Sequence, residues 1–280
     1  MKISFRGLGK IMVAVVLLSA GAFATSAYAD HAWGGYHWAR ISNPFTLKLG
    51  DNVSAVWDAH LVTSSLDWSV SPELDTAVVA GMANPKNCKP VSGRVEVCNS
   101  KYGNNGWLGI ASVWVSGSHI TKAATKLNDT YFNTAKYNTP AWRQFVVCQE
   151  IGHTFGLDHQ DEIFDNLNLG TCMDYTSDPD GTIAGQPDNQ HPNAHDYEQL
   201  SAIYAHLDAK TTVFSSVAGK APLALGMEDH EAAESEEEVD TDNQSEWGQA
   251  KRYDQKGRGS FYEKDLGNGR KLFTFVIWAD

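Results

Sequence analysis

The stretch from Gln149 to His159 contains residues whose types and spacing suit a metal-dependent hydrolase. Positions 149 and 153 share one face of a helix, which turns once in about 3.6 residues, and Glu150 lies on the flank of that face. Gly156 lets the chain turn, so that His159 can reach the same ion as His153. A catalytic zinc ion needs three protein ligands, a bound water and a base such as Glu150 that takes the water's proton.

Gln149 occupies a position where an imidazole would be the stronger zinc ligand. Three outcomes remain open on the residues alone: Gln149 is a weak third ligand, another side chain completes the site, or the site holds metal poorly and the chain is not a peptidase. Tyr175, His191 and His195 are the candidates for the second outcome. Both of these histidines are expected to be surface residues at the start of the last helix.

The same stretch resembles the signature of the metzincin metalloproteases, HExxHxxGxxH followed by a methionine turn. The residues that match the signature are Glu150, His153, Gly156, His159 and Met173. The resemblance implies one catalytic zinc ion, with His153 and His159 as ligands and Glu150 as the general base. It gives Met173 and Gly156 structural roles. It also implies that Tyr175 reaches the metal or stabilises the oxyanion, as the tyrosine of the methionine turn does in astacins and serralysins.

The resemblance covers about residues 33–209 and implies the fold of a matrixin- or astacin-like zincin domain, of α/β (α+β) class. That fold has a twisted, mostly parallel sheet with an antiparallel edge strand, an active-site helix and a C-terminal helix. Residues 107–115 look similar to the edge strand, which in this family pairs with an extended peptide or protein substrate. An ordinary core strand is the alternative for the same residues.

Patterns in the sequence predict the elements that would carry the site. Thr139 can cap a helix that starts at Pro140 and ends before Gly156. Two more helices are expected over residues 54–64, capped by Asn52 or Ser54, and over residues 195–207. Strands are predicted at residues 45–49, 75–80, 94–97, 107–115 and 119–127.

The four cysteines favour two disulfide bonds if the chain is exported, although four cysteines allow three pairings. Cys88 and Cys98 flank a short segment with proline and glycine and are expected to close a local loop. That leaves Cys148 with Cys172, whose bond would tie the site helix to the methionine turn. A cysteine-bound zinc is disfavoured because the sequence contains no CxxC pair.

Residues 1–29 have the pattern of a cleavable signal peptide. Lys2, Arg6 and Lys10 precede an apolar run over residues 11–24, and Ala27-Tyr28-Ala29 forms a cleavage site. The apolar run is shorter than the roughly 20 residues that span a bilayer. We therefore expect cleavage after Ala29 and a secreted protein that is not held in a membrane.

The net charge of −12 argues against nucleic acid as a partner. Much of this charge lies in residues 228–246, which contain no Lys or Arg and are expected to be disordered. The predicted division is a signal peptide (1–29), a catalytic domain (30–215), an acidic linker (216–246) and a small C-terminal β segment (247–280). This last segment reads as a β-hairpin that docks on the catalytic domain or on a partner. The protein is expected to be a monomer.

Two functions remain on the sequence alone. The first is a secreted zinc-dependent metalloendopeptidase, and the second is a metzincin-fold binding or structural protein that lost catalysis with its first histidine. Asp178, Asp180 and Asp188 could offer oxygen ligands to calcium. Their spacing does not fit an EF-hand, so a solvated loop is favoured over a calcium site.

Overall fold

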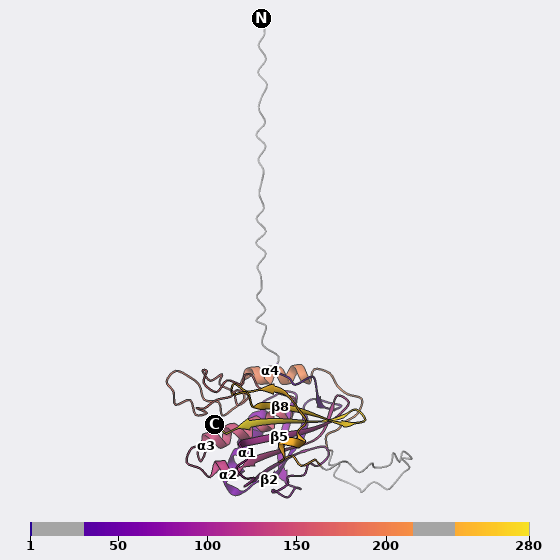
Figure 1. Ribbon diagram of the computed structural model, residues 1–280. Helices are drawn as coiled ribbons and strands as arrows, with labels where there is room; N and C mark the ends of the chain where they lie inside the picture. The colour runs from indigo at the N-terminus through magenta and orange to yellow at the C-terminus, as the bar shows by residue number, and fades with distance from the viewer. Residues whose placement is uncertain (2–30, 215–238, 280) are drawn as a thin grey trace, which may run out of the picture.

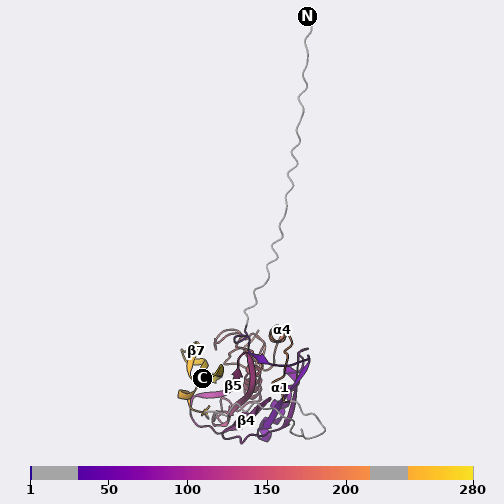
Figure 2. The same cartoon turned by 90° about the vertical axis from the view of Figure 1, so that its right-hand side faces the viewer.

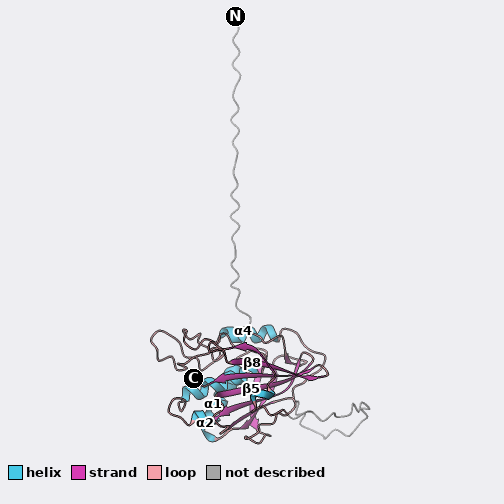
Figure 3. Ribbon diagram, in the orientation of Figure 1, coloured by secondary structure: helices cyan, strands magenta, loops and turns pink. Residues whose placement is uncertain are grey.

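The computed structural model describes Met1, residues 31–214 and residues 239–279. Residues 2–29 of the predicted signal peptide, with its cleavage site, and residues 216–238 of the predicted linker lie outside these ranges. Within them the chain forms a mixed α/β fold, in which helices pack against one large sheet (Figures 1 and 3). None of the helices in the described ranges has the length and apolar character that a membrane span requires.

Every helix and strand predicted above corresponds to an element of the structure. The helices of the described residues are α1 (Ala55–Trp68), α2 (Asp129–Phe132), α3 (Pro140–His153) and α4 (Ala194–Ile203). The strands are β1 (His37–Trp38), β2 (Phe45–Asn52), β3 (Leu74–Ala80), β4 (Val95–Ser100), β5 (Trp107–Ser116), β6 (His119–Asn128), β7 (Gln249–Tyr253), β8 (Gly259–Gly267) and β9 (Arg270–Trp278). The sequence patterns did not indicate α2, β1 or β7.

The strands follow the order β3-β2-β4-β6-β5-β9-β8-β7, and β1 pairs with β6. Neighbouring strands among β3, β2, β4 and β6 run parallel, whereas β5 is antiparallel to β6. This half of the sheet has the parallel strands and the antiparallel neighbour that the resemblance implied. Figure 2 shows β7, from the far end of the order, on the opposite side of the molecule from α1.

The C-terminal hairpin changes the position of β5 in the sheet. β9 pairs antiparallel with β5 along its whole length, and β8 and β7 extend the sheet further. The predicted hairpin is therefore confirmed and docks on the rest of the chain. The edge position that the resemblance implied for β5 is wrong, and the alternative for the same residues, a strand inside the sheet, is confirmed. The physical reason is that an exposed edge offers unpaired N–H and C=O groups, which a strand of the same chain can satisfy.

The predicted linker extends too far toward the C-terminus. Lys126 of β6 forms an ion pair with Asp242 at 2.6 Å, and the indole N–H of Trp247 donates to the Thr241 carbonyl at 2.8 Å. Trp247 is buried in an apolar cluster together with Trp107 and Trp278. Residues 239–246 are thus held against the sheet by the ion pair of Asp242 and by the buried Trp247 that follows them.

Helix α3 begins as its sequence predicts. The Thr139 hydroxyl accepts a hydrogen bond from the backbone N–H of Trp142 at 3.2 Å, and Pro140 is the first helical residue. The helix ends at His153, and Gly156 follows with a φ of 106°, a conformation that favours glycine. All residues from Ala141 to His153 are buried, so α3 is the central helix of the fold.

Helices α1 and α4 differ from their predicted lengths. α1 follows its N-cap Ser54 and continues to Trp68, whose side chain is fully buried. α4 ends at Ile203, before the predicted Leu207, which is 57% exposed. The guanidinium group of Arg40 binds the carbonyl of Tyr204 at 2.7 Å, and this contact satisfies a carbonyl just beyond the last turn of α4.

Candidate metal centre

The end of α3 and the loop after it bring His153 and His159 together. Their ring centroids lie 4.5 Å apart, and the ring planes are perpendicular. Gly156 makes this return possible, since a Cβ at this position would come within 2.7 Å of the Tyr36 carbonyl oxygen. The turn that the sequence placed at Gly156 thus sets the two imidazoles side by side.

Each imidazole is fixed through its Nδ1 atom. His153 Nδ1 lies 2.9 Å from the Leu157 carbonyl oxygen, and His159 Nδ1 lies 2.9 Å from Glu162 Oε1. Because both partners only accept, each Nδ1 carries the proton and each Nε2 presents its lone pair. Both Nε2 atoms are buried and have no hydrogen-bond partner among the described residues. This is the orientation that a metal-binding histidine requires.

Gln149 lies on the same side of α3, one turn before His153, and is fully buried. Its side-chain nitrogen donates to the carbonyl oxygens of Cys172 at 2.9 Å and Asp174 at 3.4 Å. These contacts fix the amide, and its oxygen has no partner among the described residues. The free atom of Gln149 is therefore the one that can coordinate a cation.

Glu150 is fully buried, and neither of its carboxylate oxygens has a hydrogen-bond partner within the described ranges. Burial raises the pKa of Glu150 well above its usual range, and it lowers the pKa of His153 well below. Gly109 of β5 allows the close approach to the sheet, because a Cβ there would lie 2.6 Å from Glu150 Oε1.

Five buried polar atoms at this place are therefore unpaired within the described part of the chain. They belong to Gln149, Glu150, His153 and His159. An unsatisfied buried polar group costs about 1–3 kcal/mol, so five together approach the roughly 5–15 kcal/mol of a typical folding free energy. A cation bound by two imidazole nitrogens and one amide oxygen would remove most of this cost. The donor set fits zinc, which accepts both nitrogen and oxygen ligands.

The turn that contains Met173 packs on α3 and is joined to it. Cys148 and Cys172 form a disulfide bond, as predicted, and so do Cys88 and Cys98. The fully buried Met173 packs so closely on the helix that a Cβ on Gly152 would come 2.5 Å from its sulfur.

Tyr175 also reaches the site, but its hydroxyl group has another partner. Its ring lies 4.6 Å from the ring of His159, and the hydroxyl donates to the Val276 carbonyl of β9 at 2.7 Å. The other two histidine candidates have different contacts. His191 pairs with Asp67 at 2.7 Å, and His195 packs its ring against His31.

The sequence reasoning missed the residues that support His159. The Glu162 carboxylate accepts hydrogen bonds from the His159 ring and from the Ser260 hydroxyl at 2.8 Å. It also lies 3.7 Å from the Arg252 guanidinium. Arg252 also pairs with Asp158 at 2.5 Å. Glu162, three residues after His159, is a signal that could have been used, because a metal-binding histidine often donates its other ring N–H to a carboxylate.

The C-terminal strand covers the whole group. Phe275 of β9 stacks on the His153 ring, with centroids 4.2 Å apart and planes at 10°. Its register partner is Ala111, so β9 lies along the part of β5 that passes over Glu150. None of the residues that offer unpaired atoms is more than 4% exposed.

No family model matches the chain, and no curated protein matches it in sequence. Among solved structures it is similar to high choriolytic enzyme 1, a hatching enzyme zinc-protease from Oryzias latipes (medaka fish), at 11% identity and a TM-score of 0.35, covering 62% of this chain and 96% of that one. A myroilysin structure gives 11% identity and a TM-score of 0.35, covering 60% and 96%. A crystal structure of myroilysin gives 12% identity and a TM-score of 0.32, covering 64% of this chain and 96% of that one.

Proposed function

We propose that the chain is a secreted zinc-dependent metalloendopeptidase of the metzincin type, and that its own C-terminal strand covers the site in the form described here. The observation that carries this proposal is the group of five unpaired, buried polar atoms at the end of α3. Two of them are imidazole nitrogens whose lone pairs are directed by Nδ1 contacts. The two disulfide bonds support the export that this function requires.

The residues have distinct roles in the proposed reaction. His153 and His159 hold the ion through Nε2, and Gln149 holds it through its amide oxygen. Bound zinc would lower the pKa of a water from 15.7 to about 7 and polarise the scissile carbonyl. Glu150 accepts the proton of the attacking water and passes it to the leaving amine. Once β9 is displaced, the hydroxyl of Tyr175 is released from Val276 and can donate to the oxyanion.

The substrate class follows from the strand that β9 covers. β5 is in register with nine residues of β9, from Arg270 to Trp278, and alternate pairs along this antiparallel ladder exchange backbone hydrogen bonds. If β9 leaves, β5 presents the same groups to an extended peptide, with little dependence on side chains. An extended segment of a protein is therefore the proposed substrate.

The test compares covered and opened enzyme. A recognition sequence for a site-specific protease is inserted between residues 215 and 238, and casein hydrolysis is measured before and after cleavage and displacement of the C-terminal hairpin. We expect activity only after opening, and we expect Glu150→Ala to abolish it while zinc stays bound. Equal activity of the opened parent and the opened Glu150→Ala variant would refute the proposed mechanism.

A second function is favoured by Gln149 and by the complete burial of the site. In that case the chain is a metzincin-fold binding or structural protein without catalysis. Stoichiometric zinc without any hydrolysis after opening would support this second function. Gln149→His tests whether position 149 faces the ion. If it does, the stronger imidazole ligand should tighten zinc binding and support hydrolysis. Unchanged zinc affinity would show that position 149 does not face the ion.

A further inference from the structure

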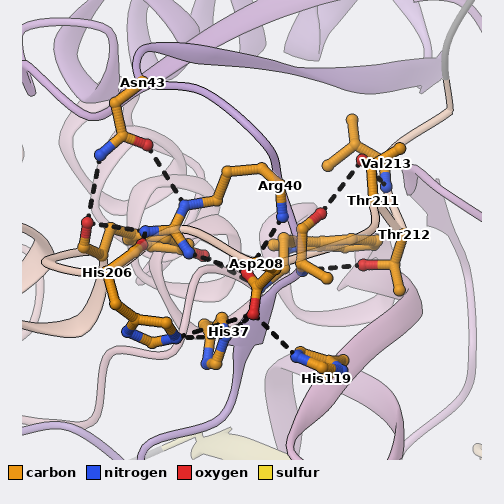
Figure 4. Close-up of polar contacts among 12 residues, drawn as sticks. His37, Arg40, Asn43, His119, His206, Asp208, Thr211, Thr212 and Val213 are labelled. Carbon is orange, nitrogen blue, oxygen red and sulfur yellow. Dashed lines mark hydrogen bonds and ion pairs between the residues drawn. The ribbon is translucent and has the colours of Figure 1, made fainter.

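A second group of histidines lies outside the candidate metal centre, around Asp208. Figure 4 shows His37, His119 and His206 with their rings directed toward this carboxylate. Their Nε2 atoms lie 3.4, 3.1 and 3.7 Å from Asp208 Oδ1. His37 belongs to β1, His119 begins β6, and the other two residues follow α4. Segments far apart in the sequence thus meet at one oxygen atom.

Contacts with Arg40 orient Asp208 as a ligand. The other oxygen of Asp208 is taken by the Arg40 guanidinium at 3.0 Å and the Arg40 backbone N–H at 3.1 Å, which leaves Oδ1 for the histidines. The Arg40 contacts therefore fix the carboxylate with Oδ1 directed at the three imidazoles.

Hydrogen bonds between neutral side chains do not account for the position of His37. Its Nδ1 lies 3.0 Å from the Gly35 carbonyl oxygen, which only accepts, so Nδ1 carries the proton. Nε2 lies 3.4 Å from the Asp208 carboxylate. If Nε2 carries only its lone pair, the two acceptors repel, so a cation must lie between them: either a proton, which makes His37 an imidazolium, or a metal ion.

The separations within the group fit a bound ion. Nε2 of His37 lies 3.2 Å from Nε2 of His206, and these atoms lie 3.4 and 3.7 Å from Asp208 Oδ1. Zinc binds nitrogen and oxygen at about 2.0–2.2 Å, and a tetrahedron of that size has edges of about 3.3–3.6 Å. Three ligand atoms at such spacing can share one ion without a large movement of the backbone.

We propose that His37, His206 and Asp208 bind a second, structural zinc ion. His119 donates to the Asp208 carboxylate from the side and holds its orientation, and water or a small displacement of His119 fills the fourth position. The ion would tie β1 to the segment after α4, near both ends of residues 31–214. This site is independent of the peptidase proposal, since its ligands are not in the candidate metal centre.

The test counts zinc in the purified full chain after equilibration with zinc chloride and removal of excess metal. His206→Ala should lower the content by about one ion per chain, because it removes one of three protein ligands. The His206 side chain is 57% exposed, so this variant is expected to fold. His191→Ala is the matched control, an exposed histidine that also pairs with a carboxylate, and should leave the content unchanged.

A second pair of variants separates this site from the catalytic one. A His153→Ala, His159→Ala double variant should retain one ion, and adding Asp208→Asn should remove it. Zinc should also raise the thermal midpoint of the double variant, and Asp208→Asn should abolish that shift. Unchanged zinc content in both His206→Ala and Asp208→Asn would overturn the proposal, whatever the activity of the enzyme.

Discussion

Phe275 lies flat on the imidazole of His153, at a centroid distance of 4.2 Å. Because the ring of Phe275 is fully buried, it closes the site from the side of the sheet. The strand that carries it is also the register partner of β5. Closure and strand pairing are therefore one feature, and the proposed peptide substrate can reach Glu150 only if β9 moves.

Phe275→Ala should open the site to small molecules. Loss of the ring leaves His153 without its cover, and we expect zinc to pass to a chromogenic chelator at least about tenfold faster. Truncation of a buried phenylalanine also costs about 3–5 kcal/mol of folding free energy, which urea unfolding will measure. Phe273→Ala is the control, because Phe273 is equally buried on β9 but packs against Trp33, Tyr36 and Phe261. Equal zinc release from both variants would show that Phe275 is not the cover.

Glu162→Gln should weaken zinc binding without removing a ligand. The carboxylate accepts from His159 Nδ1 at 2.9 Å, and loss of its charge makes the imidazole a poorer donor to the metal. Substitutions of such carboxylates typically reduce metal affinity about 10–100-fold. Competition with a chelator of known affinity measures the effect. Glu263→Gln, which removes a carboxylate paired with Lys271 on the hairpin, should leave affinity unchanged.

The two disulfide bonds should differ in their effect on the metal. Their sequence separations are 24 residues for Cys148–Cys172 and 10 for Cys88–Cys98. Loss of either bond should lower the folding free energy by about 3 kcal/mol. Only the Cys148→Ala, Cys172→Ala variant should also weaken zinc binding, because that bond joins α3 to the turn whose carbonyls orient Gln149. Equal zinc affinity in the two variants, measured by chelator competition, would contradict this account.

The parts of the site that the sequence predicted depend on local signals. Thr139 and Pro140 define the start of α3, and Gly156 defines the turn after it, because capping and positive φ involve only neighbouring residues. Cys88 could be paired with Cys98 by their short separation. These features do not require knowledge of how distant segments meet.

The parts that could not be predicted depend on distant segments. The predicted edge position of β5 was wrong because its partner, β9, lies more than 150 residues later in the chain. Such a distant pairing leaves no local signal in the sequence of β5. The same contact gives the Tyr175 hydroxyl a partner on Val276. No local signal marks His37 as a partner of Asp208, because the two residues lie 171 positions apart and only the fold brings them together.

The last prediction concerns pH and the loop that contains Asp178. Burial alone would raise the pKa of Asp178, but hydrogen bonds from Thr182, Ile183 and Gln186 lower it to about 2. An unfolded aspartate titrates near about 3.9, so the ionised form stabilises the fold above that pH, and this stability is lost as the pH falls toward 2. The free energy of unfolding is measured with urea at several pH values between about 5 and about 2. Over this range it should fall by about 1 kcal/mol more in the parent than in Asp178→Asn, after allowance for solvent screening.

Calcium should not change that result, because the Asp178 carboxylate already accepts from four groups of the protein: the Thr182 N–H at 3.1 Å and hydroxyl at 2.7 Å, the Ile183 N–H at 2.9 Å, and the Gln186 amide at 2.5 Å. Asp180→Asn, at an exposed position of the same loop, is the control and should follow the parent. A parent whose pH dependence equals that of Asp178→Asn would mean that these contacts contribute nothing to stability. A calcium-dependent rise in the urea midpoint that Asp178→Asn abolishes would instead assign the carboxylate to a cation.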